Sequence, residues 1–188
     1  MIEPTFEKFI YCLEAIPDAE NAIETKTLEG LEQLAMQGIP SIYNYCDSIE
    51  GLEMQVGTLV YDDEHFSDYE IIYLVMKGNK NSIQLNDYLY SLEEIAELFE
   101  GKLKGKIIYF ANSKRLDLTV VEARYFLDIT GARAVIGYGA PSTTLSSWLI
   151  DRLFFTFYFD NNDMVEVFEL VHKKHKEVCK ALDFKMYC

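Results

Sequence analysis

Two histidines and a cysteine near the C-terminus have the spacing of metal ligands on a helix. His172, His175 and Cys179 stand at positions i, i+3 and i+7, so a helix would carry them on one face. Two imidazoles and a thiolate are groups that bind Zn²⁺. The sequence offers no fourth ligand beside them, and the ammonium groups of four neighbouring lysines would repel a cation. These lysines are Lys173, Lys174, Lys176 and Lys180. We therefore predict no bound metal and no cofactor, and a partly exposed C-terminal helix.

The four cysteines, Cys12, Cys46, Cys179 and Cys188, follow no disulfide-framework spacing. Two of them lie in strand-like segments, which predicts reduced thiols in the cytoplasm. Cys12 or Cys46 could act as a nucleophile only by reaching a cleft, and their strand positions predict an interior orientation. His65 stands in an acidic stretch ahead of a strand, which is the wrong end of that strand for catalysis.

The elements that must position any site alternate between strand and helix. Buried strands are predicted at residues 8–13, 41–46, 70–76, 106–111 and 133–138, with a small hairpin over 83–90. Capping boxes at Ser91/Glu94 and Thr119/Glu122 begin two of the intervening helices. Further helices are predicted from about residue 143 to 159 and from 163 to about 182. This pattern predicts one domain over 1–188, a three-layer α/β/α sandwich around a mostly parallel sheet of five to six strands.

In an open parallel sheet, ligands bind where the strands end at their carboxyl edge. The loops expected there cover residues 14–19, 46–48, 77–81, 112–115 and 138–144. The glycines of Gly137-Tyr138-Gly139 do not form a phosphate-binding loop, because the full glycine spacing and the lysine and hydroxyl of a P-loop are missing. We therefore expect any binding or catalytic site to be formed by the side chains of these loops.

Two of these loops carry a resemblance to a known family. Residues 72–78, followed by 83–85, resemble the caspase-like strand that ends in His-Gly. Residues 105–113 resemble the next family strand, which ends in the nucleophilic cysteine, and residues 130–138 resemble the strand after that. Over roughly residues 70–155, up to the Asp151-Arg152-Leu153 start of an apolar helix, the chain is similar to small bacterial caspase-like proteins. The resemblance implies a caspase-like fold.

Carried over residue by residue, the family's general base falls on Lys77 and its nucleophile on Ser113. The family's chemistry needs a thiol that is easily activated and an imidazole that moves protons near neutral pH. Neither group is present at these positions. We therefore expect a catalytically degenerate domain, a pseudo-enzyme that binds a protein or a peptide.

The alternative is a hydrolase in which Ser113 and Lys77 form an unorthodox Ser/Lys pair. A lysine begins near a pKa of ~10.4 and would have to fall by roughly three units to act as a base. The surrounding negative charge of the chain favours the ammonium form instead.

The charge of the chain limits the kinds of molecule that it is expected to bind. Acidic residues outnumber basic residues 31 to 17, which gives a net charge of -14. Because like charges repel, nucleic acid and anionic membrane surfaces are not expected as partners. The chain opens with no signal-peptide pattern and has no apolar run long enough to span a bilayer, so we expect a cytoplasmic protein.

One apolar segment suggests a further contact. Residues 153–159 read Leu-Phe-Phe-Thr-Phe-Tyr-Phe, with aromatic side chains on all sides of the expected helix. A single helix face cannot bury all of them, so the surplus could form a homodimer or partner interface.

Overall fold

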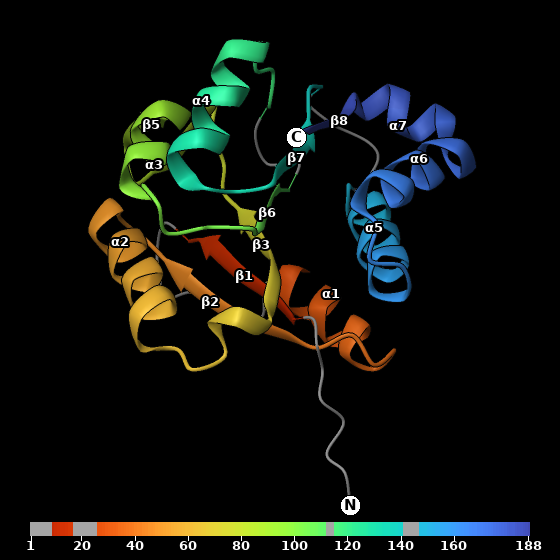
Figure 1. Cartoon of the computed structure of the whole chain (residues 1–188), viewed down its shortest axis with the longest axis horizontal. Coiled ribbons are helices and arrows are strands. Elements are labelled where there is room, and N and C mark those ends of the chain that lie inside the picture. The colour runs from red at the N-terminus through yellow and green to blue at the C-terminus, as the bar shows by residue number, and fades with distance from the viewer. Residues whose placement is uncertain (1–8, 17–25, 112–114, 141–146) are drawn as a thin grey trace, which may run out of the picture.

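The computed structural model describes residues 9–16, 26–111, 115–140 and 147–188. Its centre is a six-stranded sheet with the order β2-β1-β3-β6-β7-β8, in which β8 alone runs antiparallel to its neighbour (Figure 1). The strands are β1 (Phe9–Ala15), β2 (Ser41–Cys46), β3 (Tyr69–Val75), β6 (Ile107–Phe110), β7 (Ala134–Tyr138) and β8 (Phe184–Tyr187). Helices cover both faces, which confirms the predicted three-layer α/β/α sandwich.

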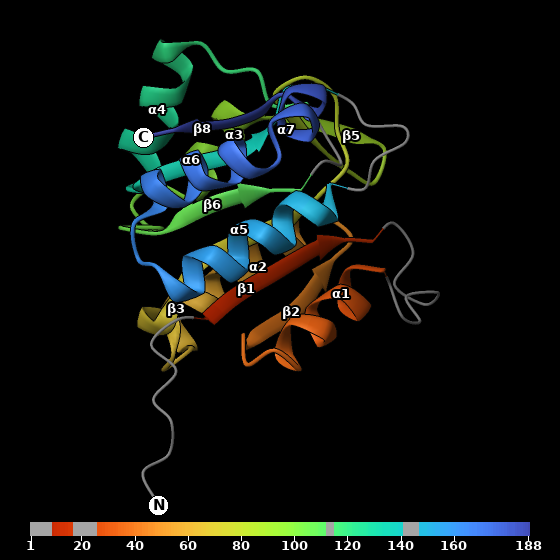
Figure 2. The ribbon, with the colours of Figure 1, turned by 90° about the vertical axis from the view of Figure 1, so that its right-hand side faces the viewer.

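The two helical layers build two separate hydrophobic cores (Figure 2). One face is covered by α2 (Ile49–Gly57), α3 (Leu92–Leu98) and α4 (Val120–Thr130). The other is covered by α1 (Lys26–Ala35), α5 (Trp148–Asp160), α6 (Met164–Lys174) and α7 (Lys176–Leu182). A π-helical turn, η2 (Thr58–Asp62), and a 3₁₀ turn, η3 (Phe66–Asp68), connect α2 to β3. A separate hairpin pairs β4 (Ser82–Leu85) with β5 (Tyr88–Ser91), as the sequence predicted.

Alternation along the central strands explains why both faces need cover. In β3, Ile72 and Leu74 point into the core beneath α2, α3 and α4, whereas Ile71 and Tyr73 point into the core beneath α1 and α5. Successive strand side chains point to opposite faces, so a strand that is apolar throughout must be covered on both.

The predicted helix signals are present. Ser91 accepts a hydrogen bond from the Glu94 amide while the Glu94 carboxylate accepts one from the Ser91 amide, and Thr119 and Glu122 form the same box on α4. Gly131 ends α4 at φ 76°, a left-handed conformation that suits glycine.

The prediction of one helix from 163 to about 182 is wrong. Helix α6 ends at Lys174, His175 leaves the helical region at φ -129° and ψ 42°, and α7 begins at Lys176. The chain then reverses at Asp183, with φ 49°, and enters β8, a strand that the sequence pattern did not reveal. The backbone partners of this short strand lie in β7, far away in sequence, so no local signal announces it.

The aromatic residues of α5 pack against the core of the same chain. Phe154, Phe155 and Tyr158 are buried, and Leu153, Phe157 and Phe159 pack partly buried against the same core. Helix α6 packs beside α5, which accounts for aromatic residues on more than one helix face. A homodimer through residues 153–159 stays a prediction. The longest helix in the described ranges, α5, has 13 residues, and none of these helices is long and apolar enough to cross a bilayer.

Candidate functional site

The structure places the strands of the two family positions side by side. Strands β3 and β6 are adjacent and parallel, so their carboxyl ends lie at the same edge of the sheet. Lys77 follows β3 and is exposed, and its carbonyl accepts a 2.7 Å hydrogen bond from the Gln84 amide. Ser113 lies outside the described residues, so a pairing between Lys77 and Ser113 remains a prediction.

Close packing of the backbone explains why a glycine, Gly78, follows Lys77. A Cβ atom at Gly78 would lie 1.9 Å from the carbonyl oxygen of Ser82, so the backbone of the β3–β4 connection approaches too closely for any side chain. Gly78 is therefore needed to begin the hairpin, whatever residue stands at position 77.

All four thiols of the chain lie in the described residues, and three of them are in the interior. Cys12 and Cys179 are fully buried and Cys46 nearly so. Burial raises the pKa of Cys12, and it raises the pKa of Cys46 to about 12 and that of Cys179 to about 11. A thiol must ionise to act as a nucleophile, so these three are chemically inert at neutral pH. Cys188, the last residue, is exposed.

Two of the three imidazoles, those of His65 and His172, have their contacts elsewhere than at the carboxyl edge of β3 and β6. His65 is exposed ahead of β3, where its Nδ1 contacts Asp68 at 3.1 Å. The Nε2 atom of His172 lies 3.1 Å from the carbonyl of Phe184, and its ring stacks on the Phe184 ring.

The spacing of His172, His175 and Cys179 does not produce the single helix face that the sequence suggested. His175 stands at the break between α6 and α7, and the Cys179 Sγ contacts the carbonyl of Val171 inside the core. In the part of the chain that the structure describes, no three His, Cys, Asp or Glu side chains are grouped to hold a metal ion.

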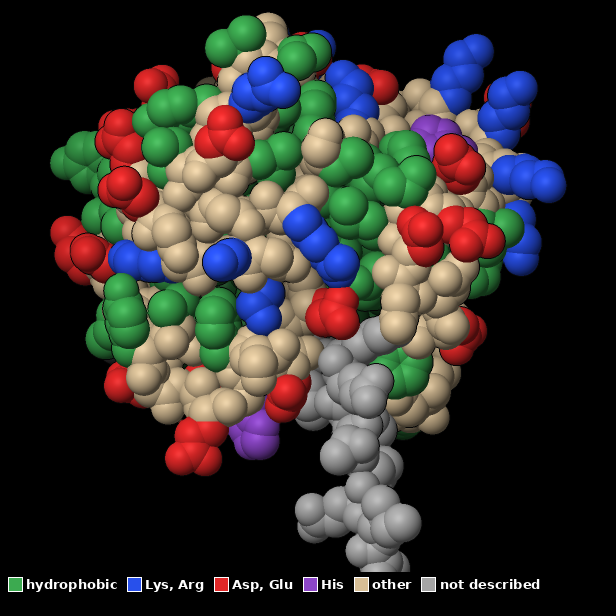
Figure 3. All heavy atoms as spheres, in the orientation of Figure 1, with side chains coloured by type: hydrophobic (Ala, Val, Ile, Leu, Met, Phe, Trp, Pro, Cys, Tyr) green, Lys and Arg blue, Asp and Glu red, His purple; other side chains and the backbone are tan. Residues whose placement is uncertain are grey.

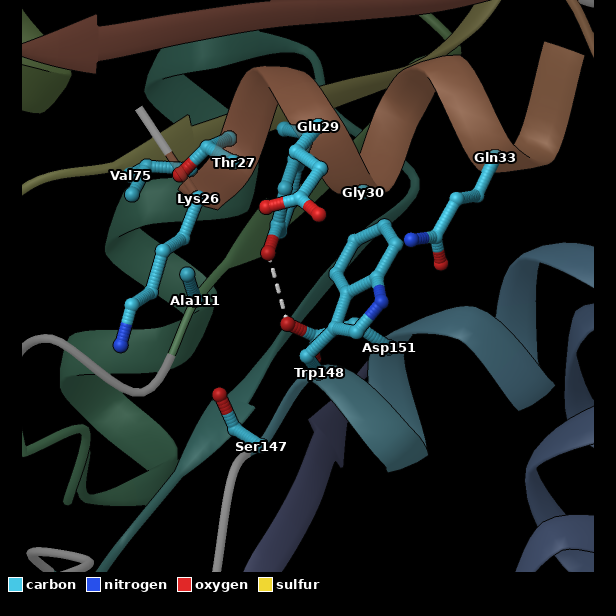
Figure 4. A pocket seen from close by; sticks show the side chains of 11 residues that line it. Lys26, Thr27, Glu29, Gly30, Gln33, Val75, Ala111, Ser147, Trp148 and Asp151 are labelled. Carbon is cyan, nitrogen blue, oxygen red and sulfur yellow. Dashed lines mark hydrogen bonds between the residues drawn. The ribbon is translucent and has the colours of Figure 1, made fainter. Parts of the chain in front are cut away.

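A cleft of about 400 Å³ opens at the carboxyl edge of the sheet, between α1 and the first turn of α5 (Figure 4). Val75, the last residue of β3, and Ala111, the residue after β6, both line it. The polar and aromatic lining comes mainly from the two helices and includes Lys26, Thr27, Glu29, Gln33, Ser147 and Trp148. The cleft thus adjoins the strand ends that precede both family positions.

The innermost polar group of the cleft is the carboxylate of Asp151, on α5, which is 1% exposed. Three central strands each direct one tyrosine hydroxyl at it. Tyr73 donates to Oδ2 at 2.6 Å, Tyr109 donates to Oδ1 at 2.8 Å, and Tyr138 also donates to Oδ1. The hydroxyls of Tyr109 and Tyr138 lie 3.0 Å apart. Among the described residues the donors to this carboxylate are hydroxyl groups, those of the three tyrosines and of Ser147, and none is a cation.

Burial dominates the electrostatics of this group. Desolvation raises the pKa of Asp151 to about 6, although the three tyrosine hydroxyls, which favour the ionised form, pull it down. Burial and the nearby Asp151 charge raise the pKa values of Tyr73, Tyr109 and Tyr138 well above the ordinary range, so all three stay protonated donors. Above this raised pKa, Asp151 places a buried anion at the cleft floor.

The cleft wall depends on a glycine in α1. A Cβ atom at Gly30 would lie 2.6 Å from the indole ring of Trp148, so the absence of a side chain lets the indole rest against the helix. We predict that Gly30→Ala displaces Trp148, although alanine favours a helix. Because Trp148 is the only tryptophan of the chain, its emission spectrum measures the displacement directly. Gly57→Ala, at an α2 position where a Cβ meets nothing within 4 Å, is the control and should leave the spectrum unchanged.

Sequence reasoning missed Asp151 and its tyrosines as a group. The sequence pattern places Asp151 only at the start of the apolar helix that resembles the family's. The available signal was weak: β3 contains two tyrosines, β6 and β7 contain one each, and a buried tyrosine hydroxyl needs a partner. Asp151, in the first turn of the largely apolar helix α5, is the natural candidate for that partner.

One family model matches almost the whole length of this chain. A family of unknown function, DUF6642, matches residues 7–188. The chain belongs to this family. A comparison with curated proteins finds no match. The match covers both cores, the residues that line the cleft, and β8.

Proposed function

We propose that the chain is a catalytically degenerate caspase-like domain that binds a peptide or a protein segment in the cleft at the carboxyl edge of its sheet. The observation that carries this proposal is the place of the cleft. Val75 and Ala111 line it, and each stands two residues before a position where the resemblance puts a catalytic group. Lys77 and Ser113 occupy those two positions in place of an imidazole and a thiol.

The lining of the cleft suits a peptide. The indole of Trp148 offers an apolar surface, while Gln33 and Thr27 offer hydrogen-bonding groups for a peptide backbone. The cleft is lined by two carboxylates, those of Glu29 and Asp151, and by one ammonium group, that of Lys26. The balance of charge favours a ligand that brings a cationic side chain.

The inert thiols support the loss of cysteine protease chemistry. An exposed loop nucleophile with an adjacent imidazole is the arrangement that such catalysis needs. The cysteines of this chain are instead buried, or stand at the C-terminus in the case of Cys188. All four are free thiols, which supports the cytoplasm as the compartment.

The fluorescence of Trp148 tests the binding. Titration with lysine- or arginine-containing peptides is expected to shift the emission, whereas peptides with aspartate at the same positions should not. Glu29→Lys, on the cleft, is expected to weaken binding by at least about tenfold. Glu32→Lys is the matched control, because Glu32 is an exposed residue of the same helix that does not line the cleft. Equal binding by both variants would show that the ligand binds elsewhere.

A fluorophosphonate probe separates the proposal from the Ser113/Lys77 hydrolase. The pseudo-enzyme predicts no labelling of the wild-type chain. Labelling that disappears in Ser113→Ala and in Lys77→Ala would establish the hydrolase instead.

A further inference from the structure

The carboxylate at the cleft floor has no cation beside it among the described residues. Asp151 is 1% exposed, and its hydrogen-bond donors are hydroxyl groups, which carry no charge. Moving an anion out of water is costly, and neutral donors replace only part of the hydration that it loses. A neutral side chain at this position would avoid that cost. The buried charge therefore points to a ligand that brings the missing cation.

The titratable and charged groups around Asp151 do not supply this cation. Besides the three tyrosines, the same core contains the thiols of Cys12 on β1 and Cys179 on α7, and burial raises the pKa values of both, so they are uncharged near neutral pH. From α1, Lys26 and Glu29 line the cleft. In Figure 4 the Lys26 side chain extends away from the Asp151 carboxylate, whereas the Glu29 carboxylate points into the cleft and adds to its negative charge.

The cleft gives a cationic side chain a path to this carboxylate. Tyr73 and Asp151 both line the cleft, and their 2.6 Å hydrogen bond lies among the other lining side chains (Figure 4). The Trp148 indole stands beside them. An aromatic face attracts a cation, and it also covers the methylene stem of a lysine or arginine side chain. A ligand side chain that lies along the indole thus directs its charged end at the floor.

We propose that Asp151 selects a cationic ligand in the cleft, and that the ligand's ammonium or guanidinium group replaces a proton on this carboxylate. The inference rests on the proposed function, since it concerns the same cleft. Desolvation favours the protonated carboxyl group, whereas a nearby cation favours the carboxylate. Binding of the cation therefore releases the proton to the solvent, and the affinity for the ligand rises with pH.

The size of this pH effect follows from the position of the titration. The pKa of Asp151 is raised to about 6. The ionised share therefore grows from about one in ten at pH 5 to about nine in ten at pH 7. Because the ionised form is the one that attracts the cation, the apparent dissociation constant is expected to fall roughly tenfold over this range. At pH 6, binding is expected to release about half a proton per ligand.

Two capped peptides test the proposal. The first is acetyl-Gly-Leu-Lys-Leu-Gly-amide, which carries one positive charge, and the second has norleucine in place of the lysine. Trp148 emission measures binding from pH 5 to pH 7, and calorimetry in two buffers of different ionisation enthalpy measures the released proton. We expect the lysine peptide to bind the wild-type chain roughly tenfold more tightly at pH 7 than at pH 5. Asp151→Asn is expected to bind it weakly and equally at both, and the norleucine peptide should bind weakly throughout.

The general charge of the surface requires a control. Figure 3 shows acidic side chains at several places on the molecule, and a net charge of -14 attracts any cationic peptide. Asp128→Asn removes the same charge from an exposed position on α4 and should bind like the wild type.

A second variant keeps the carboxylate and moves its titration. Tyr73→Phe removes a hydroxyl that favours the ionised form, so it raises the pKa of Asp151 further. The rise in affinity should then occur at higher pH than in the wild type. Tyr11→Phe is the control, because the Tyr11 hydroxyl lies in the other core, where it accepts a hydrogen bond from Asn44. It should leave the pH dependence unchanged.

Circular dichroism establishes which variants are folded, and Tyr73→Phe decides the matter if Asp151→Asn is not. Lysine-peptide binding that is independent of pH and releases no proton would overturn this inference and leave peptide binding at the cleft intact. Equal binding by Asp151→Asn and Asp128→Asn, or by Tyr73→Phe and Tyr11→Phe at every pH, would do the same. Binding of neither peptide would contradict the proposed function itself, and this inference with it.

Discussion

Asp151→Ala is expected to lower the free energy of unfolding by roughly 2–4 kcal/mol, the largest effect of any single substitution considered for this chain. The Tyr73 hydroxyl would lose its only hydrogen-bond partner among the described residues. The Tyr109 and Tyr138 hydroxyls would keep each other, and that of Tyr138 would also keep a 3.4 Å contact with the Ser147 carbonyl. A cavity would add to the loss. Removal of the buried charge works in the opposite direction and offsets part of this loss.

Chemical denaturation at neutral pH measures this effect. Asp128→Ala is the matched control, because it removes the same group from an exposed position of α4 and is expected to change stability by less than about 0.5 kcal/mol. Similar losses for the two variants would mean that the tyrosine shell does not depend on Asp151.

The second large effect is a pH dependence that belongs to Asp151. Its pKa is raised to about 6 in the folded chain, against an ordinary value of 3.8. The folded state therefore holds a proton that the unfolded chain releases. The stability contributed by this group is fully present below about pH 4 and is lost as the pH rises through about 6. A difference of about two pKa units corresponds to roughly 3 kcal/mol.

Comparison with Asp151→Asn isolates this contribution. Asp117 and Glu122 have lowered pKa values, through contacts with Lys80 and Lys185 and with Thr119 respectively. The stability that these two carboxylates contribute increases as the pH rises. Because Asp151→Asn retains both of them, their contribution cancels in the comparison. The wild-type free energy of unfolding, minus that of Asp151→Asn, is expected to fall as pH rises from 4 to 7. A difference that stays constant over this range would mean that Asp151 titrates normally.

Much of the fold could be predicted because its signals are local. Buried runs such as residues 71–75, the two capping boxes and Gly131 each specify their own conformation. The break at His175 and the strand β8 could not be found in this way. Strand β8 depends on β7, which supplies the backbone partners for Phe184–Tyr187, and the residues around His175 carry no proline or glycine that would mark the break.

The candidate site was predictable only in its location. The carboxyl edge of β3 and β6 follows from the alternation of strands and helices, and the cleft lies there. The main polar group of the cleft could not be predicted from the sequence. Four different elements supply its residues, which are Tyr73, Tyr109, Tyr138 and Asp151. Only the register between the strands and the packing of α5 on the sheet bring the four together.

The central claim, binding without cysteine protease chemistry, is tested most directly by a proteome-derived peptide library incubated with the purified chain and examined by mass spectrometry. We expect peptides retained by the wild-type chain, lost with Glu29→Lys, and recovered uncut, with no rapid alkylation of Cys12 or Cys46 by iodoacetamide. Cleaved peptides together with a hyper-reactive Cys12 or Cys46 would contradict the account.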